Sequence, residues 1–398
     1  MKPRVLQLID SFHQGGTERQ AVQLIGLLVD CDRYDLRVAC LNHEGALLDQ
    51  LPAVGQVLTY PLTGFYNANF VRQTRKLARY LRQERIQILQ THDFYTNIIG
   101  MAAGCWAKVP VRIAGKRETG SMRTPRQAFV ERQAFSGAHA IVVNASAVAK
   151  FLVASGVSEG KLVTIYNGVP VTAPRDLSDT EREVLLKELG LPGGRLVTIV
   201  ANLRHPVKDQ ETFLRAAKII HSAVPEAVFV IAGEGERLDE LRSYAAAQGL
   251  ADVAVFTGRC SRVPDLLAVS EVGVLSSLNE GFSNSILEYL AAGIPVVTTD
   301  VGGAREAVGD GETGFIVPVK DHQAMAARVI ELLRDPERRR QMGVNGRAIV
   351  EETFSLGARL RATENLYAKL LGQKQIATDA EVDAVVANGY ASGQGPVH

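Results

Sequence analysis

Two glutamates flank a glycine and a run of helix-capping residues in the stretch Asn-Glu-Gly-Phe-Ser-Asn-Ser-Ile-Leu-Glu, residues 279–288. Glu280 and Glu288 stand eight residues apart, and Gly281 lets backbone approach a ligand closely. The pattern predicts a loop that becomes a helix and ends near Gly293. Such a segment suits a ligand with hydroxyl groups at both ends and an anion between, since the amides of a helix start attract anions. The alternative is a capped core helix carrying two solvent-exposed acids.

Two cations precede another predicted helix in the stretch ANLRHPVKD, residues 201–209. Arg204 and Lys208 follow a predicted strand, and the helix is expected to begin near Asp209. Two cations held at a strand end suit a pyrophosphate. The alternative is an ion pair at the surface with Asp209.

Three glycine pairs lie where predicted strands turn into helices. Gly15 and Gly16 follow the first strand, and their pairing predicts a tight turn that holds a phosphate or a sugar, with Thr17 capping the next helix. The stretch AGEGERLDEL carries Gly233 and lacks the third glycine of a dinucleotide fingerprint, which favours a turn. We expect Gly302-Gly303 to shape a wall opposite a base or sugar. For Gly15-Gly16, a plain strand-to-helix turn remains the alternative.

His92 ends a predicted strand, where a histidine can meet a sugar hydroxyl or a leaving group. The alternative is a histidine that makes structural hydrogen bonds. The eight histidines show no HxxH or HExxH spacing, and the four cysteines show no CxxC spacing. The sequence therefore predicts neither a metal site nor a disulfide framework.

Short apolar runs alternate with amphipathic stretches along both halves of the 398 residues. Alternation of this kind predicts βα units with a parallel sheet covered on both faces. The Pro- and Ser-rich stretch over 168–181 predicts a linker between two such domains. We expect an α/β fold with two Rossmann-like domains, over 1–170 and 171–354, a helix over 355–372 and a weakly structured tail over 373–398. Parallel sheets bind ligands at the carboxyl ends of their strands, so face-to-face domains would share one cleft.

The formal net charge of +1 hides an asymmetry. Residues 1–170 hold 20 basic and 12 acidic residues, a net of +8, and the remainder holds 24 and 31, a net of −7. Thirteen basic and four acidic residues lie between Arg72 and Arg132. The imbalance predicts that the first domain meets an anionic surface, and we expect peripheral contact with an anionic membrane. No apolar run is long enough for a transmembrane helix and no signal peptide is expected, which favours the cytoplasm, at the inner face of the cell membrane.

Taken together, these motifs resemble the GT-B glycosyltransferases, and within them the large retaining family 4. The resemblance covers roughly residues 4–371 and is stronger in the second half. The residues that carry it are Gly15-Gly16, Arg204 with Lys208, Asn167-Gly168-Val169, Gly233 to Gly235, and the E-x7-E stretch from Glu280 to Glu288 followed by AAGIPVVTTDVGG.

The resemblance implies sugar transfer from a nucleotide diphosphate sugar to a glycan or lipid-linked acceptor, with retention at the anomeric carbon. It implies no obligatory metal, no other cofactor and no nucleic-acid partner. Arg204 and Lys208 would hold the leaving diphosphate, Glu288 the ribose and Glu280 the donor sugar. Backbone amides would bind sugar hydroxyls or phosphate oxygens, from Gly281, Phe282, Ser283 and Asn284.

The sequence departs from the family pattern at two places. Many relatives carry a histidine after the fifth strand, where this chain has Lys116 and Arg117, so His92 is the remaining histidine candidate. Asn202 stands where the phosphate motif often has arginine, and Arg204 would substitute for it.

Two other functions fit the same motifs. One is nucleotide-sugar epimerisation on the same fold, and the other is a non-catalytic subunit that binds sugar nucleotides. The intact charged residues at 204, 208, 280 and 288 argue against the non-catalytic subunit. The missing GxGxxG motif argues against a nicotinamide dehydrogenase.

Overall fold

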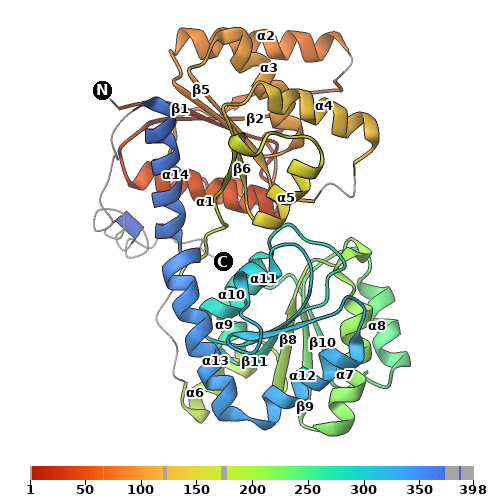
Figure 1. The fold of residues 1–398 in the computed structure, drawn as a ribbon. Helices are drawn as coiled ribbons and strands as arrows, with labels where there is room; N and C mark the ends of the chain where they lie inside the picture. Colours follow the sequence, from red (N-terminus) through yellow and green to blue (C-terminus); the bar gives the residue numbers. More distant parts are fainter. Residues whose placement is uncertain (1, 66, 120–122, 172–176, 373–384, 387–398) are drawn as a thin grey trace. The chain divides into compact units, whose positions relative to one another are not determined.

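A computed structural model describes residues 2–65, 67–119, 123–171, 177–372 and 385–386. The chain divides into two compact units (Figure 1). The first unit contains the chain up to Gly168 and again from Leu356, and the second contains Val169–Ser355. Within the described ranges, no helix is both long and apolar enough to cross a membrane.

The first unit alternates strands and helices. Its strands are β1 (Arg4–Ile9), β2 (Asp35–Cys40), β3 (Leu58–Thr59), β4 (Ile88–Thr91), β5 (Val111–Lys116), β6 (Ala140–Val143) and β7 (Leu162–Thr164). Its helices are α1 (Gly16–Asp30), α2 (Ala68–Gln83), α3 (Phe94–Ala107), α4 (Pro125–Ser136), α5 (Ser146–Ala154) and α14 (Leu356–Leu371), with short 3₁₀ turns η1 (Leu48–Gln50) and η2 (Glu159–Lys161).

The first sheet is entirely parallel, with strand order β3-β2-β1-β4-β5-β6-β7. Successive side chains of β1 enter different cores because strand side chains alternate between faces. Val5 and Ile9 pack with α1 and α14, whereas Leu6 and Leu8 pack with α2 and α3. The sheet is therefore buried on both faces, as the alternating pattern predicted.

The second unit repeats this plan. Its strands are β8 (Arg195–Val200), β9 (Ala227–Ala232), β10 (Ala254–Gly258), β11 (Ser270–Leu275), β12 (Val296–Thr299) and β13 (Gly314–Val317). Its helices are α6 (Asp179–Glu188), α7 (Gln210–Ala223), α8 (Leu238–Ala247), α9 (Val263–Ala268), α10 (Asn284–Ala291), α11 (Ala304–Ala307), α12 (His322–Arg334) and α13 (Pro336–Ile349), with the 3₁₀ turn η3 (Pro206–Lys208) and the π-helical turn η4 (Val350–Phe354).

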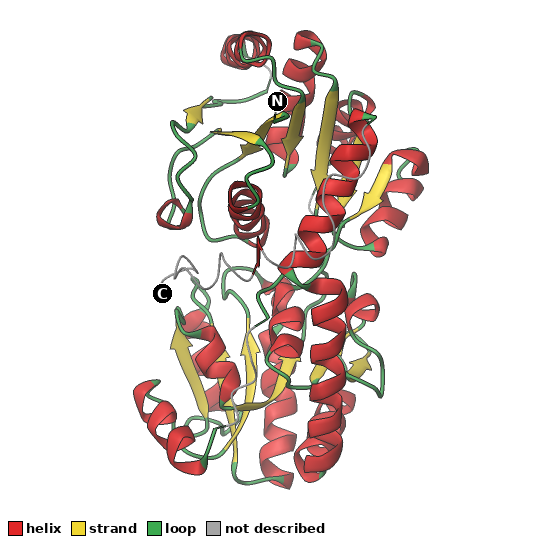
Figure 2. Cartoon of the chain, turned by 90° about the vertical axis from the view of Figure 1, so that its left-hand side faces the viewer, coloured by secondary structure: helices red, strands yellow, loops and turns green. Residues whose placement is uncertain are grey.

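The second sheet has the order β10-β9-β8-β11-β12-β13, again fully parallel. Figure 2 shows its strands in yellow among red helices. Phe229 and Ile231 of β9 pack against α7, whereas Val228 and Val230 face the core that includes α6 and α9. The chain leaves β8 toward β9 and later returns on its other side as β11. This reversal is a topological switch point, the place where open parallel sheets bind ligands.

The expected linker is shorter than the sequence suggested. Helix α6 begins at Asp179, and Ser178 caps it by accepting a hydrogen bond from the Glu181 amide, while Glu181 bonds back to Ser178. This capping box makes 178–181 part of the helix, contrary to the linker expected over 168–181. The tail expected over 373–398 lies outside the described residues except for 385–386.

Candidate active site

The carboxyl ends of β8 and β11 bring together charged residues that are 72 positions apart. Lys208 Nζ donates a hydrogen bond of 2.6 Å to Glu280 Oε1. The side chains are 19% and 14% exposed, so both charges are largely removed from water. The partner of Lys208 is therefore the first glutamate of the E-x7-E stretch and not Asp209, the partner in the alternative interpretation.

Polar contacts hold this ion pair in place. Ser277 Oγ donates a second bond of 2.6 Å to Glu280 Oε1. Ser276 Oγ donates to the Lys208 carbonyl at 2.9 Å, and the Leu278 amide donates to the Val207 carbonyl at 2.8 Å. The loop after β11 is therefore bonded to the η3 turn after β8, which restricts the rotamers of Lys208 and Glu280.

Asp209 does not pair with Lys208. Its backbone is left-handed at φ 44°, and its Oδ2 accepts from Thr212 Oγ1 at 2.7 Å inside the first turn of α7. The sequence-based alternative of an ion pair between the two neighbours is wrong because this backbone turn directs the carboxylate into the helix start.

Arg204 is held more loosely than Lys208. Its Nη2 lies 3.4 Å from Glu234 Oε1, and both side chains are almost half exposed. Exposed pairs of this length contribute little free energy. Arg204 is thus a cation at the same strand end that can reorient at low cost.

Gly302 and Gly303 support the Glu280 loop. Gly302 has φ +54°, and a Cβ there would lie 2.4 Å from the Glu280 carbonyl oxygen. The Gly303 amide donates to the Gly281 carbonyl at 2.8 Å. The glycines expected to line a wall opposite a base or sugar pack directly behind the loop that carries Glu280.

Helix α10 is fastened to the sheet on one side. Ser285 Oγ donates to the Val200 carbonyl at 2.6 Å, and Tyr289 Oη accepts from the Val200 amide at 2.6 Å and donates to the Val274 carbonyl at 3.2 Å. Asn284 and Glu288 are one turn apart on another side of the helix and are partly exposed. Two partly exposed polar side chains thus stand on a helix locked to β8 and β11.

Phe282 and Ser283, in the same 279–288 stretch, have structural roles. The Phe282 ring is buried and packs 5.5 Å from the Phe354 ring. Ser283 is the N-cap residue of α10 without a side-chain capping bond, and α10 ends before Gly293, which has φ +75° as predicted. Phe282 and Ser283 can therefore offer a ligand their backbone amides rather than their side chains.

Gly233 follows β9, beside the Arg204 loop. A Cβ on Gly233 would lie 1.9 Å from the Ala201 carbonyl oxygen. The Leu203 amide donates to the Glu234 carbonyl at 2.8 Å, which joins the loops after β8 and β9. The glycine is required by this close backbone packing, which agrees with the turn interpretation of AGEGERLDEL.

In the first unit, Gly15 and Gly16 stand at the start of α1. Gly15 is the N-cap residue and Gly16 the first helical residue, so Thr17 lies inside the helix and does not cap it, contrary to expectation. A Cβ on Gly15 would lie 2.0 Å from Glu18 Oε2. The absence of a side chain makes room for a carboxylate that folds back over the helix start.

His92 is buried within the first unit and is 2% exposed. Its Nε2 lies 2.7 Å from Gln7 Oε1, and Gln7 Nε2 donates to Tyr367 Oη of α14 at 2.9 Å. Burial, with the nearby charges of Arg117 and Arg359, holds the pKa of His92 well below its usual value. These contacts favour the structural alternative for this histidine, as a neutral ring that links β4 to β1 and α14.

Charged residues gather at the carboxyl edge of the first sheet. Burial raises the pKa of Asp93 to about 7, and the negative charges of Asp10 and Glu18 add to the effect. Burial also lowers the pKa of Arg117 to about 10. Arg117 Nη1 donates to Asn167 Oδ1 at 2.5 Å.

Lys116 has a different role from its neighbour Arg117. It is 3% exposed, and its Nζ donates to both oxygens of Glu131, at 3.0 and 2.9 Å. Lys116 and Arg117 were expected to contribute to a surface for an anionic membrane. Neither residue can contribute, because Lys116 forms a buried ion pair with Glu131 and the Arg117 side chain is hydrogen-bonded to Asn167.

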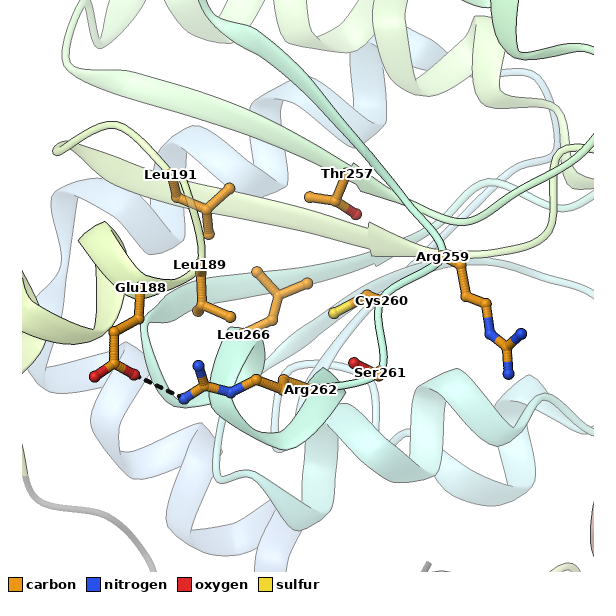
Figure 3. A pocket seen from close by; sticks show the side chains of 9 residues that line it. All are labelled: Glu188, Leu189, Leu191, Thr257, Arg259, Cys260, Ser261, Arg262 and Leu266. Atoms are coloured by element: carbon orange, nitrogen blue, oxygen red, sulfur yellow. Dashed lines mark hydrogen bonds and ion pairs between the residues drawn. The ribbon is translucent and has the colours of Figure 1, made fainter. Parts of the chain in front are cut away.

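A pocket of about 180 Å³ opens in the second unit (Figure 3). It lies between the end of α6, α9 and the loop after β10. Glu188 and Arg262 close one side with an ion pair of 3.0 Å. None of the residues proposed from the sequence line it. Its lining consists of Glu188, Leu189, Leu191, Thr257, Arg259, Cys260, Ser261, Arg262 and Leu266.

Sequence reasoning missed the residues that orient the site. Ser277, Ser285 and Tyr289 hold Glu280 and α10 in place. The sequence contains one signal for these residues, the serine pair Ser276-Ser277 directly after the buried strand β11. Residues at that position place polar groups at the carboxyl edge of the sheet. Across the residues the structure describes, no cluster of three His, Cys, Asp or Glu could hold a metal ion.

Comparison with known proteins agrees with this geometry. Residues 14–173 match the family described as Glycosyltransferase Family 4, and residues 181–349 match Glycosyl transferases group 1. HepE from Anabaena, crystallised with UDP, has a TM-score of 0.80 at 20% identity and covers 93% of this chain and 100% of its own. These findings define a GT-B fold. The chain belongs to glycosyltransferase family 4, group 1.

Curated relatives match at higher sequence identity, but two of the three described here match over only about half of their own length. The N-acetyl-alpha-D-glucosaminyl L-malate synthase of Bacillus anthracis is 29% identical over 210 residues, 52% of this chain and 54% of the relative. The UDP-Gal:alpha-D-GlcNAc-diphosphoundecaprenol alpha-1,3-galactosyltransferase of Escherichia coli is 25% identical over 374 residues, 90% and 95% of the two chains. EpsD of Bacillus subtilis is 31% identical, with 47% of its length matched. The match thus spans about half the length of EpsD and of the malate synthase.

Proposed function

We propose that this protein is a retaining glycosyltransferase that moves a sugar from a nucleotide diphosphate sugar to a glycan or lipid-linked acceptor. The observation that carries the proposal is the Lys208–Glu280 pair at the switch point of the second sheet. Support comes from the solved relative that contains UDP and from the relative named for UDP-Gal and a diphosphoundecaprenol acceptor.

The charges at the strand ends suit a diphosphate leaving group. Glu280 compensates the partly buried charge of Lys208. A diphosphate would give Lys208 a second anionic partner, Arg204 can swing toward it, and the first amides of α10 add positive potential. We assign Glu288 to the ribose hydroxyls and Glu280 to the hydroxyls of the donor sugar.

In the proposed reaction, the acceptor approaches the anomeric carbon from the side on which the diphosphate departs. The bond from the anomeric carbon to the phosphate oxygen breaks as the bond to the acceptor oxygen forms. The acceptor proton passes to the departing phosphate. This route requires no enzyme nucleophile, which agrees with a Glu280 that is held by Lys208 and Ser277.

The charge of the first unit supports a proposal for the location of the acceptor. Five basic residues of α2 are exposed at helical spacing: Arg72, Arg75, Lys76, Arg79 and Arg82. We propose that this face meets anionic lipid at the cytoplasmic side of a membrane, where the protein would contribute to a surface polysaccharide or glycolipid. Phe65, Tyr66 and Phe70 are expected to add shallow apolar contact with the membrane. Phe65 packs edge to face with Phe70 of α2 at 5.9 Å, and Tyr66 lies outside the described residues.

A melting screen with UDP-, GDP- and ADP-sugars tests the proposal. A ligand at a hundredfold excess over its dissociation constant should stabilise the fold by about 2.7 kcal/mol. The proposal predicts a raised melting temperature with at least one nucleotide sugar, and loss of that shift when Lys208 is replaced by methionine. Unchanged melting with every donor would contradict it, and conversion of UDP-GlcNAc without acceptor would favour the epimerase.

A further inference from the structure

A second pocket, which we call the α4–α5 groove, lies within the first unit. It has a volume of about 320 Å³, at the lower end of the range for small-molecule sites. Helix α4 supplies one wall, and α5 with the turn that follows supplies the other. The lining residues are Arg123, Pro125, Ala128, Phe129, Glu131, Arg132, Phe135, Phe151, Leu152, Ser155 and Val157.

The groove is apolar inside. Phe135, Leu152 and Val157 are at most 8% exposed and form its buried floor. Phe129 stands at the rim and is 54% exposed, which is unusual for so large an apolar side chain. A hydrocarbon chain lying between Phe129 and Phe151 would remove apolar surface from water at both walls.

The charge that remains at the groove is positive. Both oxygens of Glu131 accept from Lys116, and Arg123 donates to Glu118 at 2.6 Å. Arg132 makes no hydrogen bond or ion pair with any other residue the structure describes. A free guanidinium therefore stands beside an apolar groove whose acid is already neutralised.

Arg132 lies next to Phe129 at the apolar rim of the groove, and both residues belong to α4. Its guanidinium carbon lies 5.9 Å from the centre of the Phe129 ring, three residues earlier on α4. A ligand with a chain against Phe129 would thus present its first polar group to Arg132. Guanidinium groups bind phosphate oxygens through paired hydrogen bonds, so a phosphate is the polar group of the ligand that suits Arg132 best.

We propose that the α4–α5 groove binds the lipid-linked acceptor of this protein, with a single hydrocarbon chain against Phe129 and Phe151 and the adjoining phosphate on Arg132. The inference rests on the proposed function for its statement that the ligand is the acceptor. Helix α4 begins after the loop at the carboxyl end of β5, so the groove opens from the strand edge where the first unit would receive an acceptor.

Calorimetry with decyl phosphate below its micellar concentration tests the groove, with decanol and inorganic phosphate as the two partial ligands. Wild-type protein should bind decyl phosphate at least about tenfold more tightly than decanol, and inorganic phosphate alone should not bind measurably. Arg132→Gln should weaken decyl phosphate about tenfold and leave decanol unchanged. Phe129→Ser should weaken both chain-bearing ligands.

The controls use exposed positions on the same two helices that do not line the groove. Arg126→Gln removes a similar charge from α4, and Val153→Ser removes an exposed apolar side chain from α5. Neither should change decyl phosphate binding. Equal losses in these controls, or equal affinity in wild type and Arg132→Gln, would overturn the proposal.

Two further results separate the groove from the other proposals. Arg132→Gln should leave co-sedimentation with anionic vesicles close to the wild-type level, because the α2 face is intact. The calorimetry contains no donor sugar. A protein that responds to nucleotide sugars but not to decyl phosphate contradicts only the groove. The opposite result contradicts the glycosyltransferase assignment, and with it the identification of the ligand as the acceptor, but leaves the groove as a site for an alkyl phosphate.

Discussion

Lys208 Nζ and Glu280 Oε1 lie 2.6 Å apart at the end of two adjacent strands, and Ser277 Oγ bonds to the same oxygen. The arrangement keeps the cation in place before any ligand arrives. A preformed cation costs no reorganisation when a diphosphate leaves, which is how enzymes stabilise developing charge most effectively. We propose two functions for the glutamate, to compensate the charge of Lys208 and to bind the donor sugar.

Glu288→Ala should weaken nucleotide binding as well as turnover. Loss of a charge-assisted hydrogen bond costs roughly 1.5–3 kcal/mol, or about ten- to a hundredfold in affinity. Calorimetry with the free nucleotide diphosphate measures this. Glu183→Ala, at an exposed position on α6, is the matched control and should bind as wild type does. Unchanged affinity in Glu288→Ala would remove Glu288 from the ribose site.

Turnover should survive EDTA. The cations for the leaving group come from side chains, and no cluster with metal-ligand composition occurs in the described part of the chain. The measurement compares initial rates before and after chelation and after added magnesium. A rate that falls with EDTA and returns with magnesium would contradict this prediction.

Asp93→Asn should change how stability depends on pH. The folded pKa of Asp93 is raised from 3.8 to about 7, so the folded state binds more protons than the unfolded state between these values. Stability contributed by this proton is present at low pH and is lost as pH rises toward 7. Asparagine cannot titrate, and its oxygen can still accept from the Thr96 amide, which caps α3 at 3.0 Å.

As pH rises from 5 to 8, the unfolding free energy of Asp93→Asn should therefore increase relative to that of wild type, by about 1 kcal/mol or more. Denaturant titrations of both proteins at several pH values measure this difference. Parallel pH profiles would show that Asp93 does not titrate in this range.

Anionic vesicles should co-sediment the protein at low salt, and neutral vesicles should not. Each exposed arginine or lysine on α2 contributes about 1 kcal/mol near such a surface, screened by salt. Arg72→Gln with Arg79→Gln should lower recovery. Lys187→Gln with Lys218→Gln removes the same charge from exposed positions of the second unit and should not. Equal recovery on neutral and anionic lipid would leave the α2 face without this role.

The strands and the long helices could be predicted because their patterns are local. Runs such as AIVVNA are β-branched, apolar and bounded by polar residues, and β6 forms there. The helix expected in LGARLRATENLYAKLL forms over Leu356–Leu371. Gly293 ends α10 because a left-handed residue without Cβ strain is needed there.

The partners of the charged residues could not be predicted from local pattern. Asp209 is next to Lys208 in sequence, but the left-handed backbone at Asp209 turns its carboxylate to Thr212. Glu280 reaches Lys208 because β8 and β11 are neighbours in the sheet. The environment of His92 depends on Gln7, which contacts its ring, and on Tyr367, which is bonded to Gln7 and lies 275 positions after His92 in the sequence. Contacts of this range follow from strand order, which no short stretch of sequence specifies.

We propose that the site around Glu280 cleaves a nucleotide diphosphate sugar with retention. Proton NMR of wild type and Glu280→Gln, each with the donor found in the melting screen and no acceptor, tests it most directly through slow hydrolysis. An α-linked donor should first release the α anomer. Glu280→Gln should be at least about tenfold slower than wild type, and its affinity for free nucleotide should change less than about threefold. Early release of the β anomer, equal rates in both proteins, or nucleotide binding weakened tenfold in Glu280→Gln would contradict it.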